Sequence, residues 1–268
     1  MASLTAVQGD EEGANEMTRS SEYLRQFARM FLDEADKTRV FFPDVKEAKL
    51  QSEGVWSDFP SIHLDYLTKP SGLLDIGIDL SGYDPAGKIR PEERVFLSAY
   101  PSFDPRELVA TDKVWKHIQG SKDADGKTLV IFNAELCRLR SDYFPALFYP
   151  EMARLSKEMI PAIETVYYVH NFKGVGSGVL FRAYPGPWEV YLRLSDGTMV
   201  LVHEQEDRPT LKEVSLEILP RSIRTFSAHA ATRRPRTSSS YRSVRLAREG
   251  SVRIRSDTRF VFRRSANV

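Results

Sequence analysis

The chain has 268 residues, 41% hydrophobic and 28% charged, which is typical of a globular protein with a sizeable buried core. The formal net charge is only +1, but 13 arginines and two acids give residues 221–268 a charge of +11, so residues 1–220 carry −10. An acidic body argues against a nucleic-acid-binding domain, and the single cysteine, Cys137, excludes an internal disulfide framework and is expected to be a buried core thiol.

The N-terminal part is predicted to contain a leader and a first helix. Residues 1–19 are predicted to be flexible, and their acidic start resembles neither a secretory signal nor a transit peptide. A helix is predicted over 22–35, where Leu24, Phe27 and Phe31 recur at helical spacing after the candidate capping serines at 20 and 21. No apolar run approaches the roughly 18 residues of a membrane-spanning helix.

Strands and helices alternate in the following segment. Strands are predicted over 39–43, 94–101 and 127–132, with weaker strands in the loop-rich stretch at 62–67 and 73–80. Helices are predicted over 45–51, capped by Asp44, over 104–118, and over 150–160 after a helix-like segment around Tyr143. This alternation favours a sheet with parallel strands.

From residue 163 the pattern changes to an antiparallel meander. Four strands are predicted, over 163–172, 178–184, 188–194 and 198–204, joined by a glycine-rich loop, by Tyr184-Pro185-Gly186-Pro187 and by Asp196-Gly197. A last helix is predicted over 207–220, with Thr210 and Glu213 as a capping box. The fold class is therefore α/β with a mixed sheet, a domain over 20–220 and an Arg/Ser-rich disordered tail over 221–268.

Motifs for common enzymes are missing from the sequence. It contains no G-x-S-x-G, H-E-x-x-H or C-x-x-C, and the glycine-rich stretch at 173–178 leads into a strand, whereas a phosphate loop leads into a helix. The histidines at 63, 117, 170, 203 and 229 lack metal-ligand spacing, although His170 and His203 are candidate neighbours. We therefore expect a non-enzymatic protein with no metal and no cofactor.

Two groups of residues are candidate binding sites. The first lies at the carboxyl ends of the predicted parallel strands, where open α/β sheets bind ligands; there Asp44, Asn133 and Glu135 would make polar contacts in a ligand-binding or enzymatic alternative. The second is an aromatic and arginine patch at one edge of the meander, which would suit protein binding or simple packing. Its members are Arg182, Tyr184, Trp188, Tyr191 and Arg208.

Several segments together resemble a known family. The stretches F-F-P-D-V-K-E-A-K-L, V-F-L-S-A-Y-P, V-I-F-N-A-E-L-C-R-L-R and L-F-R-A-Y-P-G-P-W-E-V-Y-L, with D-R-P some 20 residues later, are similar over residues 20–220 to the plant and cyanobacterial domain-of-unknown-function family DUF1995. Within it, the sequence resembles the low photosystem II accumulation proteins of chloroplasts. That resemblance implies a stromal protein that assists photosystem assembly by contacting core subunits or assembly factors, with a peripheral thylakoid contact and no nucleic acid. The family supplies no catalytic residues to carry over.

The sequence departs from that family at both ends. Members usually have a transit peptide and a further helix-and-strand segment upstream, so we expect an open sheet edge here. The Arg/Ser-rich end does not resemble the family's helical ending. We expect it to reflect an altered gene model, such as intron read-through, with a genuine basic tail as the alternative.

Overall fold

The computed structural model describes residues 10–59, 61–69, 82–101, 104–134, 136, 139, 145–174, 176–232 and 259–263, with side chains described between residues 19 and 225. The strand predicted over 73–80, the candidate ligand residue Glu135 and the core thiol Cys137 lie outside these residues. The chain divides into two compact units, residues 1–164 with 261–268 and residues 165–260. Each unit is described by itself.

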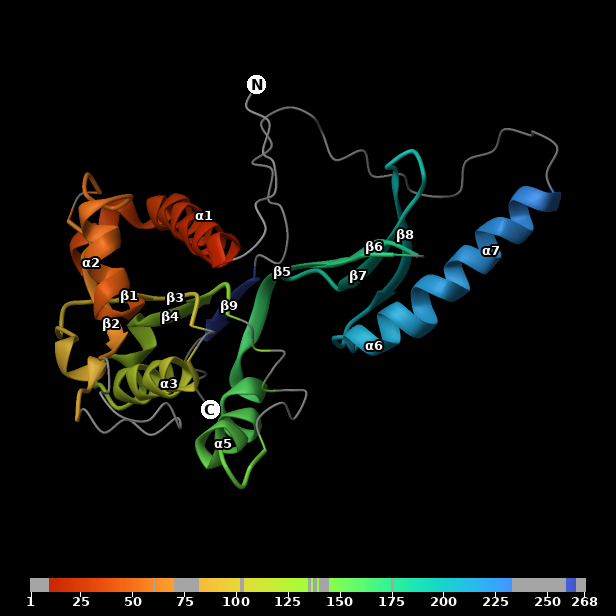
Figure 1. The fold of residues 1–268 in the computed structure, drawn as a ribbon. Helices are drawn as coiled ribbons and strands as arrows, with labels where there is room; N and C mark the ends of the chain where they lie inside the picture. Colours follow the sequence, from red (N-terminus) through yellow and green to blue (C-terminus); the bar gives the residue numbers. More distant parts are fainter. Residues whose placement is uncertain are drawn as a thin grey trace. The chain divides into compact units, whose positions relative to one another are not determined.

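The first unit alternates helices and strands, as predicted (Figure 1). Its elements are α1 Asp10–Ala28, η1 Arg29–Lys37, β1 Thr38–Asp44, α2 Val45–Glu53, β2 His63–Thr68, η2 Pro85–Lys88, β3 Val95–Ala99, α3 Pro105–Gln119, η3 Ala124–Gly126, β4 Thr128–Phe132, α5 Pro150–Glu158 and η4 Ile160–Ala162.

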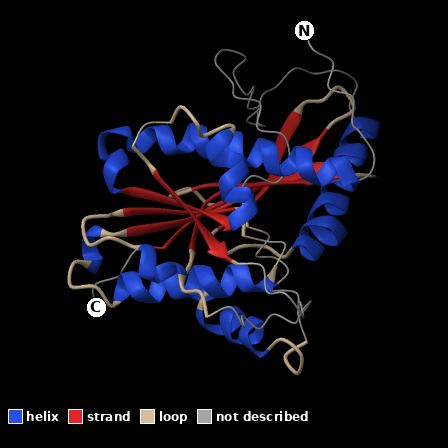
Figure 2. Ribbon diagram, turned by 60° about the vertical axis from the view of Figure 1, so that its left-hand side comes forward, coloured by secondary structure: helices blue, strands red, loops and turns tan. Residues whose placement is uncertain are grey.

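Four parallel strands form the centre of this unit, in the order β2-β1-β3-β4. All five residues of β3 are buried, and so are four of the five in β4. Such continuous burial follows from helices on both faces of the sheet, which Figure 2 shows. On one face, Phe41, Phe96 and Ile131 pack with Trp115 of α3 and Leu155 of α5.

The first helix begins earlier than predicted. It runs from Asp10 to Ala28, so Ser20 and Ser21 lie inside it and do not cap it, and the 3₁₀ segment η1 follows in place of its predicted last turns. Inside the helix, backbone amides bond to carbonyls of the preceding turn, so no serine cap is required at Ser20 or Ser21.

The second unit contains the predicted antiparallel meander and a C-terminal helical segment. The strands are β5 Glu164–Phe172, β6 Gly178–Ala183, β7 Trp188–Arg193 and β8 Met199–Gln205. The hairpins lie at the predicted turns, and Gly197 has φ +83°, the left-handed region that favours glycine. A cluster of Tyr168, Leu180, Trp188, Val190, Leu192, Val214 and Leu219 forms the core of this unit.

The last helical segment confirms the predicted cap but ends later than predicted. Thr210 and Glu213 form the capping box, and α6 Leu211–Glu213, η5 Val214–Ile218 and α7 Leu219–Thr232 follow without interruption. The helix passes Pro220 because η5 is a π turn, in which the Leu219 N–H donates to the Val214 carbonyl. Of the predicted tail, α7 and a strand β9 at Arg259–Arg263 are described.

Candidate functional site

The two described candidate ligand residues, Asp44 and Asn133, lie at the same edge of the parallel sheet but have separate structural roles. Asp44 ends β1 and caps α2, where its carboxylate accepts from the amides of Lys46 and Glu47 at 2.7 and 2.9 Å. Asn133 follows β4 and donates from Nδ2 to Ser20 Oγ of α1 at 2.8 Å. Strand β3 lies between β1 and β4, so the sheet does not place these two side chains next to each other.

A buried hydrogen-bond network fills this edge between α1, α2 and β3. Ser21 donates to Gln51 Oε1 at 2.5 Å and accepts from Trp56 Nε1 at 2.9 Å, and Gln51 Nε2 donates to Glu47 Oε1 at 2.9 Å. The Tyr100 hydroxyl donates to the same Glu47 oxygen at 2.8 Å. Ser21, Gln51, Trp56 and Tyr100 are all buried. The chain's own side chains thus occupy the edge where other α/β sheets bind ligands.

The Tyr100 hydroxyl is held as a neutral donor in this network. Burial, followed by the nearby Glu47 carboxylate, raises the pKa of Tyr100 far above its usual range. The hydroxyl therefore stays protonated at physiological pH and acts as a structural donor.

Two non-glycine residues at this edge have left-handed backbone conformations, which the sequence did not predict. Tyr100 has φ +32° and Asn133 has φ +52°, and each directly follows a buried parallel strand. Such conformations cost on the order of 1–3 kcal/mol and persist where the surroundings impose them. Here the network hydrogen bonds of Tyr100 and Asn133 hold both side chains toward the helices.

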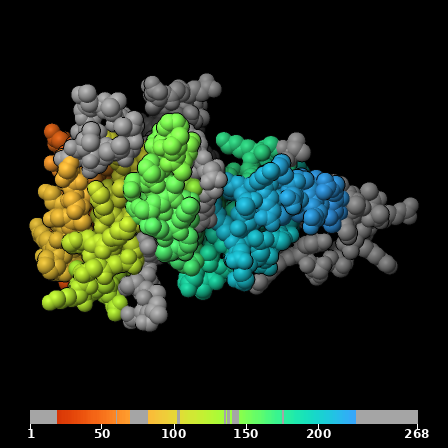
Figure 3. Space-filling model, turned by 90° about the horizontal axis from the view of Figure 1, so that it is seen from below, coloured from red at the N-terminus to blue at the C-terminus, as the bar shows by residue number. Residues whose placement is uncertain are grey.

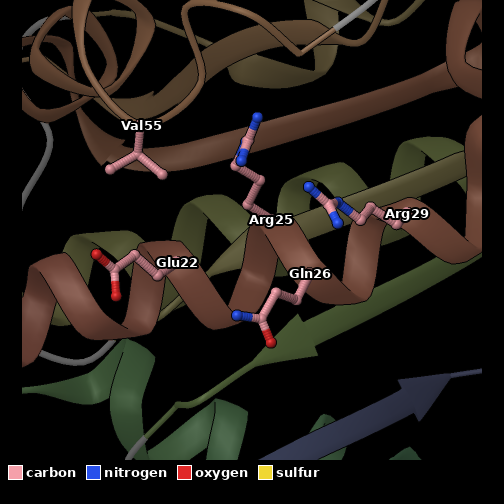
Figure 4. A pocket seen from close by; sticks show the side chains of 5 residues that line it. All are labelled: Glu22, Arg25, Gln26, Arg29 and Val55. Carbon is pink, nitrogen blue, oxygen red and sulfur yellow. The ribbon is translucent and has the colours of Figure 1, made fainter. Parts of the chain in front are cut away.

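A surface pocket lies beside α1, with a volume of about 560 Å³. It is lined by Glu22, Arg25, Gln26, Arg29 and Val55, and Figure 4 shows their side chains. Arg25 donates to Asp58 Oδ1 at 2.7 Å and stacks over the Phe59 ring at 5.5 Å, while its buried Nε has no hydrogen-bond partner among the described residues.

The charges around this pocket balance. The two guanidinium groups of Arg25 and Arg29 are offset by the carboxylates of Glu22 and Asp58, so no surplus positive charge attracts an anion. Asp58 is 77% exposed, and an ion pair so open to water contributes little. The pocket therefore has no surplus charge for an ionic ligand, and its lining residues form no recognisable catalytic group.

Four of the five residues of the predicted aromatic and arginine patch lie near one another, namely Arg182, Tyr184, Trp188 and Arg208. The guanidinium groups of Arg182 and Arg208 lie over the Trp188 ring at 5.3 and 5.4 Å, and Arg208 also donates to the Tyr168 hydroxyl at 3.0 Å. Trp188 is 2% exposed and belongs to the core of its unit. The buried part of this patch is therefore structural packing stabilised by cation–π contacts.

Tyr184 and Tyr191 behave differently from the buried tryptophan. Tyr184 is 56% exposed at the hairpin turn, with Arg182 at 5.8 Å from its ring centre. Tyr191 does not belong to the patch, which corrects the prediction. Side chains alternate along a strand, so Tyr191 faces the side of the sheet opposite Trp188 and Val190, where its hydroxyl donates to Glu189 Oε2 at 2.7 Å.

The candidate histidine pair is not formed. His170 pairs with Leu180, Leu180 with Val190, and Val190 with His203, so the two histidines lie at opposite ends of one cross-strand row. Three strand spacings of about 4.8 Å separate them, too far to share a metal ion. Among the described residues no group of three or more His, Cys, Asp or Glu side chains is placed to hold a metal ion.

A buried ion cluster in the first unit was not predicted. Arg39 donates to the Glu93 carboxylate from Nε and Nη2 at 2.7–3.1 Å and from Nη1 to Asp65 Oδ2 at 2.9 Å, and His63 Nδ1 lies 2.8 Å from Glu93. Arg39 is 5% exposed and Glu93 is fully buried. The only sequence signal was an arginine at the start of a strand that is otherwise apolar.

Comparisons with known proteins bear on the family to which the chain belongs. No helix within the described ranges has both the length and the apolar character needed to span a membrane. The sequence matches no curated protein. A family model described as a domain of unknown function, DUF1995, matches residues 4–216. Because this match covers most of the chain, the protein belongs to the DUF1995 family.

Proposed function

We propose that this protein is a non-enzymatic chloroplast factor in the stroma that assists assembly of a photosystem, photosystem II in the first instance, through protein–protein contacts. The proposal is supported by membership of the DUF1995 family and by the resemblance of the sequence to chloroplast proteins of photosystem accumulation. It is also supported by the carboxyl edge of the parallel sheet, where the described polar groups are already bonded within the chain.

The exposed ring of Tyr184 is the structural observation that supports the proposal. Its ring is more than half exposed, while the residues beneath it are fixed, since Arg182 stacks on buried Trp188 and donates from Nε to the Gly186 carbonyl at 3.4 Å. An exposed aromatic on a rigid support loses little conformational entropy on binding, which is the property of interface anchors. The hairpin turn at 184–187 is therefore our choice for the contact with photosystem subunits or assembly factors.

Affinity capture of the tagged protein from chloroplasts, followed by mass spectrometry, tests this function. We expect thylakoid core subunits or assembly factors among the enriched proteins, and we expect Tyr184→Ala to reduce their recovery about tenfold or more, the scale of an interface hot spot. Tyr191→Ala is the matched control, because it removes the same side chain from the opposite face of the same hairpin.

Two outcomes would contradict the proposal. If the capture enriches no thylakoid or assembly protein, the function is wrong. If a nucleotide or another small molecule raises the midpoint of thermal unfolding by several degrees, the ligand-binding alternative at the sheet edge gains support, since a ligand that binds only the native state stabilises it.

A further inference from the structure

The turn before α5 exposes an uninterrupted apolar run. Residues 145–150 read P-A-L-F-Y-P, and Leu147 and Phe148 are 86% and 70% exposed. Of the six residues only Tyr149 is half-buried, and it packs against the core cluster of the first unit. Adjacent large apolar side chains exposed to this degree mark an interaction site more often than a chance feature of the surface.

Two backbone amides of this turn are bonded within it. The amides of Phe148 and Tyr149 both donate to the Pro145 carbonyl, at 3.0 and 2.9 Å, and Pro145 and Pro150 have no N–H. The amides of Phe148 and Tyr149, two of the four amides in this turn, would therefore lose no hydrogen bond to water on entering a medium that offers none in return.

The shape and chemistry of the run favour a lipid surface over a protein groove. Leu147 and Phe148 are adjacent in a tight turn, whereas a segment that enters a groove as a helix presents apolar residues three and four apart. Within the run itself the only polar side-chain group is the Tyr149 hydroxyl, so the segment that would enter a partner or a lipid surface is apolar. Tyrosine beside inserted apolar residues suits the boundary between lipid and water.

The charges next to the turn are balanced within α5. Arg154 contacts Glu151 and Glu158 at 2.9 Å each, and Lys157 completes an equal number of positive and negative side chains on this helix. Figure 3 shows the turn and α5 as a green surface on the face seen from below. A membrane contact made here would therefore be apolar in origin, with little dependence on anionic lipid or on salt.

We propose that the turn at Pro145–Pro150 inserts Leu147 and Phe148 into the interfacial region of a lipid bilayer and attaches the protein peripherally to membranes. The inference depends on the geometry of the turn and not on the proposed partner contacts. A test with purified protein and vesicles therefore succeeds or fails independently of the affinity capture described above.

Sedimentation of the full chain with neutral phosphatidylcholine vesicles is the direct test. We expect binding that is unchanged between low and high salt, and a loss of apparent affinity of about 100-fold in L147S/F148S, the scale of withdrawing two large apolar side chains. The matched control is L50S/L216S, because Leu50 and Leu216 are each 63% exposed but lie in helical segments outside the turn. This control should bind vesicles as the unaltered protein does.

Fluorescence separates insertion from mere adsorption. Trp56, Trp115 and Trp188 are at most 2% exposed, so their emission should change little when vesicles are added. A tryptophan introduced by Phe148→Trp should shift its emission to the blue and be quenched by brominated lipids. Circular dichroism would verify that each variant is folded.

Two results would overturn the proposal. One is an absence of sedimentation together with an unshifted Phe148→Trp emission. The other is normal vesicle binding by L147S/F148S, which would place the membrane contact elsewhere. If the double variant instead lost protein partners without any vesicle binding by the parent, the turn would be a protein-docking element and the lipid proposal would be wrong.

Discussion

At the scale of single residues, the buried charges of the first unit depend on one another. Burial by itself would raise the pKa of Glu93, but hydrogen bonds from Arg39 and from the Arg90 amide outweigh it and hold the pKa below the ordinary value. A buried carboxylate so held stays ionised in the native protein. Removing Arg39 leaves the Glu93 carboxylate buried without its guanidinium partner, and removing Glu93 leaves the buried guanidinium with Asp65 alone. Either change is far more costly than losing a surface ion pair.

The first prediction concerns Glu93 and pH. Because the pKa is lower in the folded than in the unfolded chain, the ion pair adds stability at neutral pH and loses it as pH falls below about 4. Glu93→Gln should lower the free energy of unfolding at pH 7 by about 3–5 kcal/mol. The variant should also lose less stability than the parent between pH 5 and pH 3. Urea unfolding at each pH measures both effects. If the free energy of unfolding falls by the same amount between pH 5 and pH 3 in the variant and the parent, Glu93 does not contribute to the acid dependence.

The second prediction concerns Arg208, whose guanidinium lies 4.7 Å from the Tyr168 ring centre as well as over Trp188. Arg208→Ala removes both stacking contacts and the hydrogen bond to the Tyr168 hydroxyl, and should cost about 2–3 kcal/mol. Tyr168→Phe removes only the hydrogen bond and should cost about 1 kcal/mol. Denaturant unfolding compares the two; equal costs would show that the stacking contributes nothing.

At the scale of secondary-structure elements, caps explain why several helices begin where the sequence predicts. Asp44, Asp104 and Thr210 each accept hydrogen bonds from the first turn of α2, α3 and α6 respectively. Their short polar side chains satisfy amides that have no partner inside the helix. Asp44 therefore caps α2 as predicted, and it does so through one carboxylate oxygen, Oδ1.

The third prediction tests whether capping is the only role of the Asp44 carboxylate. Asp44→Asn keeps an oxygen acceptor at the cap and should change the free energy of unfolding little, whereas Asp44→Ala should cost about 1 kcal/mol. Thr210→Ala should cost a similar amount at the start of α6. Ser215→Ala is the control, because Ser215 is exposed inside the following helical turn, where alanine is the better helix former. An Asp44→Asn variant as unstable as Asp44→Ala would mean that the carboxylate has another role.

At the scale of the whole molecule, the protein has two units, each with its own apolar core. The core of the first packs Phe41, Phe96 and Ile131 of the parallel sheet against α3 and α5. The core of the second packs Trp188 and Val190 of the meander with Val214 and Leu219. The two clusters share no residue.

The fourth prediction follows from these separate cores. Ile131 and Val190 are both fully buried, and Ile131→Val should cost about 1 kcal/mol while Val190→Ala should cost about 2 kcal/mol. The double variant should show the sum of the two costs to within about 0.5 kcal/mol. Urea unfolding of the parent, the two single variants and the double variant gives the four free energies of this double-mutant cycle. A coupling energy well above that value would show that the two cores act as one.

The sequence by itself determined the class of fold and the position of most elements. Apolar runs at 39–43, 94–101 and 127–132 are strands because both faces of a parallel sheet are buried, and the meander follows from alternation interrupted by turn residues. The capping box at Thr210 was likewise predictable, since its chemistry is local. Local interactions leave a pattern in neighbouring residues.

Only the tertiary structure decided what the candidate residues do. The side of the sheet that Tyr191 faces depends on strand register, the pairing of Asn133 joins residues 113 positions apart, and Arg39 meets Glu93 across 54. None of these contacts has a spacing that the sequence displays. The same holds for the exposed turn at Leu147 and Phe148, because an apolar run looks identical in sequence whether the fold buries it or leaves it in water.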